Sequence, residues 1–361
     1  MNLLMITGDR ALASGKKGAF HNTLEELHKH FDRIDIICPR VPVKRYDMVL
    51  FGNVHVHPSP WPLILQPLWI RHRGAKLIRR WAHGLVTVHT YPPFYNDIGA
   101  RWLHRVVGVP TLMEVHHIVG FPRPASLRER VYRWLSLRLL PFFAKTAVGV
   151  RAVNAVQTPS ALVDMGVPQN LIRVIPSFYI DLDVFKPAAV TKQYDVAFVG
   201  RMVANKGVRL FLDILEHTGL VGVAVGDGPL LSWVRKEAKR RGLKLHTPGF
   251  VTDSPAVADI LNRSRLLLMP SYNEGGPRVV LEALACGVPV VATPVGIVPD
   301  VLPPEAIEEW NAADLSDKVR NILGDAGLYA QLRAGGLQVV VQFERSAAIR
   351  RYAEELKKIV A

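Results

Sequence analysis

The sequence predicts an α/β protein built from two doubly wound, parallel-sheet domains. Its 361 residues exceed what one ordinary hydrophobic core holds. Short apolar runs alternate with helical stretches through both halves of the chain, which is typical of parallel sheets covered by helices. A polar, Pro-containing break at residues 186–193 separates the halves. We therefore expect a first domain over residues 1–188 and a second that begins at 189.

Each expected strand is a short buried run bounded by turn residues. In the second half, the strand at 194–199 is followed by a glycine-containing loop and a helix from about Val208, and later strands are expected at 266–269 and 288–292. Three helical segments close the chain. The strands expected in the first half are 3–7, 34–38, 48–51, 85–89, 111–115 and 155–158.

Cysteine content and hydropathy indicate the compartment. Cys38 and Cys286 are the two cysteines, and both lie inside apolar runs, so a disulfide framework is not expected. The first ten residues hold too short an apolar run for a signal peptide, and no apolar stretch reaches 18 residues. These features predict a cytoplasmic protein.

The basic residues are concentrated in the first half. Residues 1–188 hold 24 Lys and Arg against 12 Asp and Glu, whereas residues 189–361 hold 21 against 19. Between Arg71 and Lys145 the basic residues are interleaved with Trp and Phe, a pattern that suits an anionic lipid surface. A solubilising face over core aromatics would give the same pattern. We expect a peripheral contact with the inner face of the cell membrane.

The most informative stretch runs from residue 270 to 296 and pairs two carboxylates with a turn and a helix start. Glu274 follows the expected strand at 266–269, and Glu282 lies eight residues later in a mostly apolar helix. Pro277 suits the first position of that helix. Carboxylates at the end of a parallel strand can accept paired hydrogen bonds from vicinal hydroxyls, although a solvated loop acid and a satisfied structural acid would fit the local pattern as well.

This stretch resembles the signature of the retaining, family 4 (group 1) glycosyltransferases of the GT-B fold. The resemblance implies two Rossmann-like domains facing a cleft, with residues 189–343 binding a nucleotide-diphosphate sugar and residues 1–188 binding the acceptor. It also implies that the last helix, 344–361, packs back onto the first domain. Glu274 would contact the donor sugar and Glu282 the nucleotide ribose. The donor-sugar loop, Gly275, Gly276 and Pro277, departs from the family's usual turn.

Two basic residues and one glycine are predicted to bind the donor's diphosphate. Arg201 and Lys206 lie in the loop after the strand at 194–199, where the family places its diphosphate-binding cations, although an ordinary basic loop would look similar. Gly18 precedes a helix in a glycine-containing loop that matches the family loosely. That loop is not a Walker A motif, because its glycine spacing is wrong. Two fixed cations can neutralise a leaving diphosphate, so we expect neither a metal nor another cofactor.

His116 follows the apolar run 111–115, at the edge where open sheets bind ligands. Isolated histidines are more often structural, and the neighbouring Glu114 and His117 lack the spacing of a zinc motif. The segment is similar to a family strand that ends in Val-His, whose histidine lies near the reacting sugar. The resemblance therefore implies a functional role for His116 beside Glu274.

The predicted activity is metal-independent transfer of a sugar from a nucleotide-diphosphate sugar to a glycan or lipid-linked acceptor, with retention of anomeric configuration. A nucleotide-sugar epimerase or hydrolase of the same fold is an alternative. A non-catalytic partner subunit is another, because residues 177–180 and Pro277 depart from the family pattern. A nucleic-acid-binding protein would explain the charge, but no recognisable module accompanies it, so nucleic acid is not an expected partner.

Overall fold

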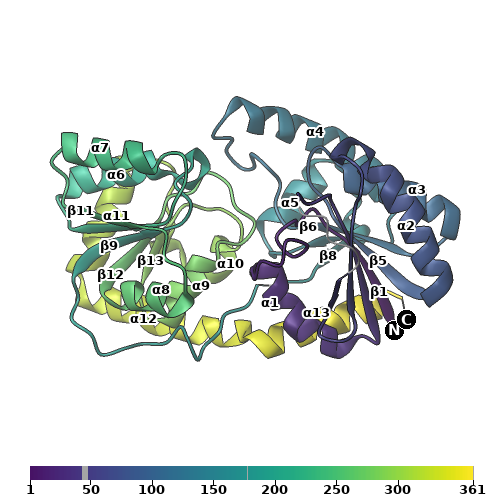
Figure 1. Cartoon of the computed structure of the whole chain (residues 1–361). Coiled ribbons are helices and arrows are strands. Elements are labelled where there is room, and N and C mark those ends of the chain that lie inside the picture. The colour runs from purple at the N-terminus through teal and green to yellow at the C-terminus, as the bar shows by residue number, and fades with distance from the viewer. Residues whose placement is uncertain (43–47, 177, 361) are drawn as a thin grey trace. The chain divides into compact units, whose positions relative to one another are not determined.

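The computed structural model describes residues 1–42, 48–176 and 178–360 (Figure 1). Contacts divide the chain into two compact units. The first unit holds Met1–Ile118, Tyr132–Ser177 and Ser346–Ala361, and the second holds Val119–Val131 and Phe178–Arg345. Of these residues, Ser177 and Ala361 lie outside the described part of the chain. Among the described residues, no helix is both long and apolar enough to cross a bilayer.

The first unit is built on an eight-stranded sheet in the order β3-β4-β2-β1-β5-β6-β7-β8. All neighbouring strands run parallel except β3 and β4, which pair in opposite directions. The central strands are apolar along their length because helices cover both faces. The strands are β1 (Asn2–Ile6), β2 (Arg33–Cys38), β3 (Met48–Leu50), β4 (Val54–Pro58), β5 (His83–His89), β6 (Thr111–Val115), β7 (Gly149–Ala152) and β8 (Ile172–Val174).

Helices lie on both faces of this sheet (Figure 1). Helix α2 packs against α3 on one face, and α1 and α13 lie on the other. Leu103 of α3 and Ile70 of α2 belong to the same buried apolar cluster as Leu4 and Val86 of the sheet. The helices are α1 (Ala19–Leu27), α2 (Gln66–Trp81), α3 (Tyr95–Val107), α4 (Leu127–Ala144), α5 (Gln157–Asp164) and α13 (Arg345–Lys358), with single 3₁₀ turns at His28–His30, Leu63–Leu65 and Gln169–Leu171.

The second unit has a five-stranded, fully parallel sheet in the order β11-β10-β9-β12-β13. Its strands are β9 (Tyr194–Val199), β10 (Gly222–Val225), β11 (Leu245–Gly249), β12 (Ser264–Met269) and β13 (Val290–Ala292). Helix α6 packs with α7 and α11, and α9 packs with α8 and α12. These helices are α6 (Val208–Thr218), α7 (Leu231–Arg240), α8 (Ser254–Asn262), α9 (Arg278–Ala285), α10 (Val298–Val301), α11 (Ala312–Gly324) and α12 (Ala326–Val340), with 3₁₀ turns at Ala204–Lys206, Pro304–Ala306 and Val341–Phe343.

The doubly wound α/β class is confirmed, and one expected strand is wrong. Residues 155–158 are not a strand; the sheet instead uses Gly149–Ala152, which pairs with β6. Asn154 explains the difference, because its side-chain oxygen accepts a hydrogen bond from the Thr158 amide (2.7 Å) and so stabilises the start of α5. Two short strands, β4 and β8, were not predicted.

The observed boundary between the units differs from the predicted one. Contacts divide the chain between Ser177 and Phe178, whereas the sequence placed the boundary after residue 188. Val119–Val131 also joins the second unit, although its neighbours in sequence belong to the first. The Asn273 side chain explains this, because it donates hydrogen bonds to the Arg123 carbonyl (3.0 Å) and to Oε2 of Glu129 (2.9 Å).

Candidate active site

In the second unit, the carboxyl ends of the neighbouring strands β9 and β12 carry the predicted donor residues. Gly200 and Arg201 follow β9, and residues 270–277 follow β12. The two loops approach closely at Gly207, which has φ +70° and whose missing Cβ would lie 1.9 Å from the Pro270 carbonyl oxygen. Only glycine fits both this backbone angle and this space. Gly207 therefore allows the two loops to pack closely at this point.

Lys206 and Glu274 form an ion pair between these loops. Glu274 Oε1 also accepts a hydrogen bond from the Ser271 hydroxyl (3.0 Å). Both charged side chains are largely buried, with 21% of Lys206 and 13% of Glu274 exposed. Glu274 is therefore held in one orientation before any ligand binds, as a group that must align sugar hydroxyls requires.

A cavity of about 290 Å³ opens beside this pair, between the ends of β9 and β12 and the start of α9. The side of the cavity formed by loops is lined by Gly200, Arg201, Lys206, Ser271, Pro277 and Arg278. Three predicted donor residues, Arg201, Lys206 and Pro277, therefore line one cavity, and Glu274 lies beside it through its pair with Lys206. The cations that line this cavity suit an anionic group.

Glu282 is the one carboxylate of α9, and its environment is apolar. Leu281 and Ala283 on either side are buried. Burial raises the pKa of Glu282 to about 7, and the nearby charge of Arg278 opposes that rise. Within the described residues, no hydrogen bond or ion pair reaches its carboxylate. An unpartnered, largely buried carboxylate is costly for the fold, which is typical of a group that binds a ligand.

The predicted donor-sugar loop is tightly packed. Gly276 lies against the ring of Phe178, because a Cβ at this position would come within 1.9 Å of that ring. Pro277 is the N-cap residue of α9, with φ −67°. The turn is therefore fitted to residues 178–180, the other stretch that departs from the family pattern.

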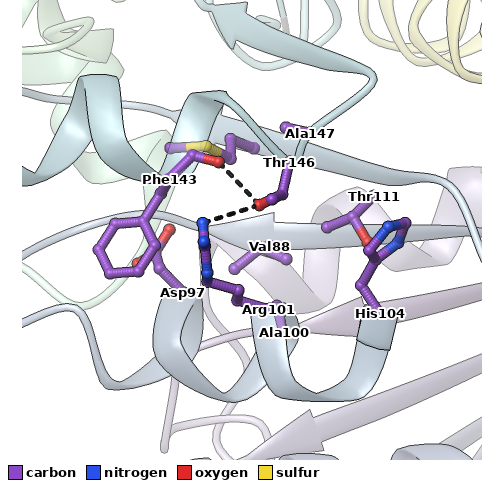
Figure 2. Close-up of a pocket in the computed structure, with 10 residues that line it drawn as sticks. Val88, Asp97, Ala100, Arg101, His104, Thr111, Phe143, Thr146 and Ala147 are labelled. Atoms are coloured by element: carbon purple, nitrogen blue, oxygen red, sulfur yellow. Dashed lines mark hydrogen bonds between the residues drawn. The ribbon is translucent and has the colours of Figure 1, made fainter. Parts of the chain in front are cut away.

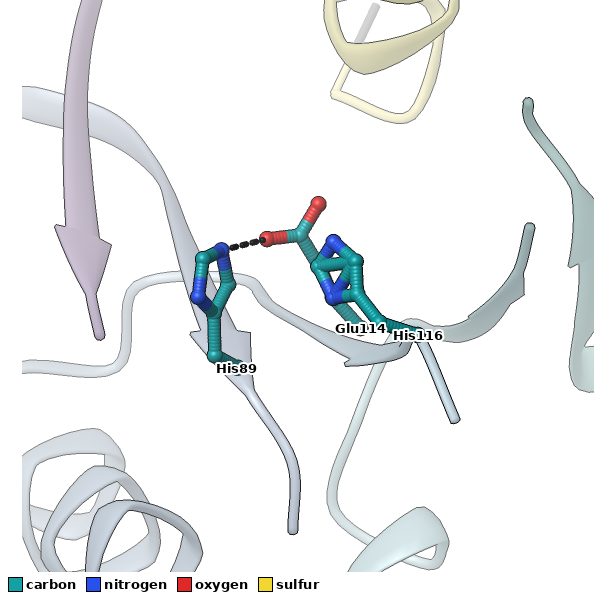
Figure 3. A group of neighbouring side chains, drawn as sticks. All are labelled: His89, Glu114 and His116. Atoms are coloured by element: carbon teal, nitrogen blue, oxygen red, sulfur yellow. Dashed lines mark ion pairs between the residues drawn. The ribbon is translucent and has the colours of Figure 1, made fainter. Parts of the chain in front are cut away.

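In the first unit, His116 lies in a cluster with His89 and Glu114 at the carboxyl ends of β5 and β6 (Figure 3). The two imidazole rings contact edge to face, with centroids 4.6 Å apart. His89 Nε2 lies 3.4 Å from Glu114 Oε2, and His89 Nδ1 shares a hydrogen bond with the Thr7 hydroxyl (2.9 Å). Burial, together with the neighbouring His89 and the charge of Arg151, lowers the pKa of His116 to about 3, so the ring is neutral at physiological pH.

Glu114 is fully buried and held by two further groups. Arg151 donates a hydrogen bond to Glu114 Oε1, and the Tyr352 hydroxyl of α13 donates to the same oxygen (2.7 Å). Although burial alone would raise the pKa of Glu114, Arg151 and the neighbouring histidines lower it to about 2. The three clustered groups could each offer one ligand atom to a metal ion, but the fixed charge of Arg151 opposes a divalent cation at Glu114.

A smaller cavity, of about 20 Å³, lies between α3 and the end of α4 (Figure 2). Asp97, Arg101 and His104 line it, and Arg101 Nη1 donates to the Thr146 hydroxyl (3.5 Å). Burial raises the pKa of Asp97 to about 8, although a hydrogen bond from Thr90 opposes that rise. This volume holds about one water molecule, so the cavity is too small for a sugar.

Gly18 belongs to the first unit, whereas the donor cavity is formed by residues of the second. It is the N-cap of α1 in the first unit, with an extended backbone, and a Cβ there would meet nothing within 4 Å. The glycine of this loop that needs its special conformation is Gly15, at φ +75°. The role of Gly18 at a diphosphate stays a prediction.

Sequence reasoning missed several residues that the structure places in these sites. Arg278 lines the donor cavity, and a cation directly after Pro277 could have been noticed as a feature of the helix start. Arg151 and Tyr352 hold Glu114, but they come from segments far along the chain and carry no local signal. His89 is the last residue of β5, and His116 directly follows β6. The sequence does show this similarity in position.

Residues 180–338 match the family model of the glycosyl transferases group 1, and they span the sheet, the ion pair and the cavity just described. The second unit is therefore similar to this family. A 2-deoxystreptamine glucosyltransferase from Streptomyces kanamyceticus is similar to this chain, at 28% identity over 288 residues that cover 72% of this chain and 73% of the relative.

Solved structures show the GT-B fold over nearly the whole of this chain. Sucrose-phosphate synthase from Thermosynechococcus elongatus is similar with a TM-score of 0.83 and 17% identity, covering 99% of this chain and 98% of that one. The Anabaena HepE protein in complex with UDP-glucose has a TM-score of 0.76 and 18% identity, covering 99% of this chain and 100% of that one. The two parallel-sheet units therefore correspond to the two domains of the GT-B fold.

Proposed function

We propose that this chain is a glycosyltransferase that moves a sugar from a nucleotide-diphosphate sugar to a glycan or lipid-linked acceptor, with retention of anomeric configuration and without a metal ion. The observation that carries the proposal is the donor cavity, where a fixed Lys206–Glu274 pair and Arg201 lie together with the unpartnered Glu282 of α9 nearby. The similar HepE structure contains UDP-glucose, which supports a nucleotide-sugar donor.

Each residue has a role that follows from its chemistry. Arg201 supplies positive charge to the departing diphosphate and so does the work that a metal ion performs in other transferases. Glu274 accepts hydrogen bonds from the donor sugar, and Glu282 accepts them from the ribose hydroxyls. Neutral His116 orients a hydroxyl at the reacting centre, because an imidazole that is not charged can accept a hydrogen bond. A donor phosphate oxygen takes the acceptor's proton on the same face.

Product analysis tests the activity. The protein is incubated with a panel of nucleotide sugars, with and without chelator, and a panel of glycan and lipid-linked acceptors, and the anomeric configuration of the product is measured by NMR. The proposal expects a retained linkage and undiminished turnover in chelator. Free sugar released without acceptor would favour a hydrolase, an inverted linkage would contradict retention, and loss of turnover in chelator would contradict metal independence.

We propose that the protein binds an anionic membrane surface and that its acceptor lies there. Helix α4 exposes three large apolar side chains in the first unit: Trp134 (55%), Leu137 (41%) and Phe142 (46%). Arg138 and Lys145 are exposed beside them, and the Arg138 guanidinium lies 5.9 Å from the Trp134 ring. Aromatic and basic side chains on one face suit the boundary between lipid headgroups and acyl chains.

Vesicle sedimentation tests this surface. The protein should sediment with vesicles rich in phosphatidylglycerol at low salt and be released at high salt, because electrostatic attraction weakens as the Debye length shortens. Equal binding to vesicles of neutral phosphatidylcholine, or none to either kind, would contradict the proposal.

A further inference from the structure

Arg278, the first residue of α9, is a third cation of the donor cavity. Its side chain is partly buried, and within the described residues no hydrogen bond or ion pair reaches its guanidinium. Its one aromatic contact is the ring of Tyr179, 4.5 Å from Cζ. A guanidinium carries five N–H donors in a fixed plane. A guanidinium that lines a cavity and donates to no protein acceptor has these groups available to bind an anion.

The charges around the cavity show which cations are available. Lys206 is paired with Glu274, so these two charges compensate each other. Neither the Arg201 nor the Arg278 side chain forms an ion pair among the described residues, although the charge of Arg278 acts on the nearby Glu282. The diphosphate of a nucleotide sugar carries one negative charge on each phosphate group, and two cations outside any ion pair match that charge.

We propose that Arg278 binds the donor's diphosphate together with Arg201, and that Lys206 acts chiefly as the positioning residue of Glu274. This inference rests on the proposed function, since it assigns a ligand contact within the same donor cavity. It changes the assignment of the second phosphate-binding cation from Lys206 to Arg278.

Tyr179 contacts the Arg278 side chain, and Phe178 contacts the turn that precedes it. The Tyr179 ring is buried, and two guanidinium groups contact it, with Arg278 Cζ at 4.5 Å and Arg345 Cζ at 5.7 Å from its centroid. Stacking on an aromatic face leaves the edge N–H groups of a guanidinium free to donate to a phosphate. Phe178 meanwhile fills the space beside Gly276. The two stretches that depart from the family pattern therefore pack together at Gly276, and Tyr179 of one of them contacts Arg278.

The test compares four variants by calorimetry: Arg278→Leu, Arg278→Lys, Lys206→Met and Arg209→Leu. Arg209 is a matched control, because its guanidinium also stacks on an aromatic ring (Trp233, 4.4 Å) in the same unit but does not line the cavity. The probes are UDP, GDP, ADP and TDP, followed by the nucleoside of whichever one binds wild type. Melting temperatures establish that each variant is folded.

Arg278→Leu should weaken nucleoside-diphosphate binding by about 10- to 100-fold and leave nucleoside binding unchanged, because a charge-assisted contact to phosphate is lost. Arg278→Lys should retain part of the affinity, and Arg209→Leu all of it. Lys206→Met should weaken binding less than Arg278→Leu, while lowering turnover through Glu274.

Each contrary result has a distinct meaning. If wild type binds a diphosphate and Arg278→Leu binds it equally well, the inference is wrong and the proposed function stands. If Arg278→Leu weakens only the nucleotide sugar and not the diphosphate, Arg278 contacts the sugar instead and the inference is again wrong. If wild type binds none of the four probes, the proposed donor site itself fails.

Discussion

The two units differ in whether their functional charged side chains have partners within the protein. In the first unit, Glu114 is compensated by Arg151 and Tyr352, and the buried Asp35 accepts hydrogen bonds from Arg33 and from His57. In the second unit, the charged groups of Glu282, Arg278 and the exposed Arg201 have no hydrogen bond or ion pair within the described part of the chain. A closed network stabilises the fold, whereas charges left open at a cavity are available to a ligand.

The largest effect is expected where a closed network is broken. Arg151→Met should destabilise the protein by about 3–5 kcal/mol, because it leaves the carboxylate of Glu114 buried without its cation. Urea unfolding measures this. Arg173→Met is the matched control, since Arg173 is exposed on the neighbouring strand β8 and should change stability by less than about 0.5 kcal/mol. Similar losses in both variants would contradict the contrast between the units.

Glu282→Gln should separate stability from binding. It should weaken nucleotide binding by about tenfold, because an amide accepts hydrogen bonds from ribose less strongly than a carboxylate. The same change should raise the melting temperature of the free protein at neutral pH, because the cost of a buried charge is removed. Calorimetry and thermal unfolding measure the two effects. A fall in both would show that Glu282 is a structural acid.

Asp97 is a buried acid of the first unit that differs from Glu114, because no cation lowers its pKa and burial raises it. Its folded pKa of about 8 exceeds the unfolded value, so the folded state binds a proton more tightly. Stability should therefore fall as pH rises from about 4 to about 8, by up to a few kcal/mol. In Asp97→Asn this contribution should disappear, and thermal unfolding between pH 5 and 9 measures the change. An unaltered pH profile would show that Asp97 is ionised in the folded protein.

The smallest effect on the fold is expected at the exposed face of α4. Trp134→Ala with Phe142→Ala should leave the melting temperature nearly unchanged, because both side chains are about half exposed. Binding to vesicles rich in phosphatidylglycerol should weaken severalfold. Phe250→Ala is the matched control, as Phe250 is 70% exposed in the second unit. Equal weakening by the control would remove the distinction between the two surfaces.

The fold was predictable where local pattern and neighbouring strands agree. The runs at 111–115 and 194–199 have the bounds of β6 and β9, because a short apolar segment between turn residues has one way to be buried in a parallel sheet. The prediction of a strand at 155–158 was wrong because the apolar segment is longer than the strand it contains, Gly149–Ala152. Pairing with β6 and the hydrogen bond from the Thr158 amide to the Asn154 side chain decided which part of it entered the sheet.

The donor site was predictable to a similar degree. Arg201, Lys206 and Pro277 line one cavity, with Glu274 attached to it, because parallel strands place the loops that follow them at one edge. Gly18 belongs to the other unit, and its role at the diphosphate stays a prediction. The glycine-rich loop of the first unit carries no feature that says which ligand it meets.

The sequence by itself determined the strand ends, the turn chemistry and the spacing of Glu274 and Glu282, because these depend on residues within a few positions of one another. Only the tertiary structure decided which charges would be compensated. Tyr352 reaches Glu114, and Phe178 reaches Gly276, across long stretches of chain. Such partners depend on the path of the backbone, since the free energy of a buried charge is set by whatever the fold packs against it.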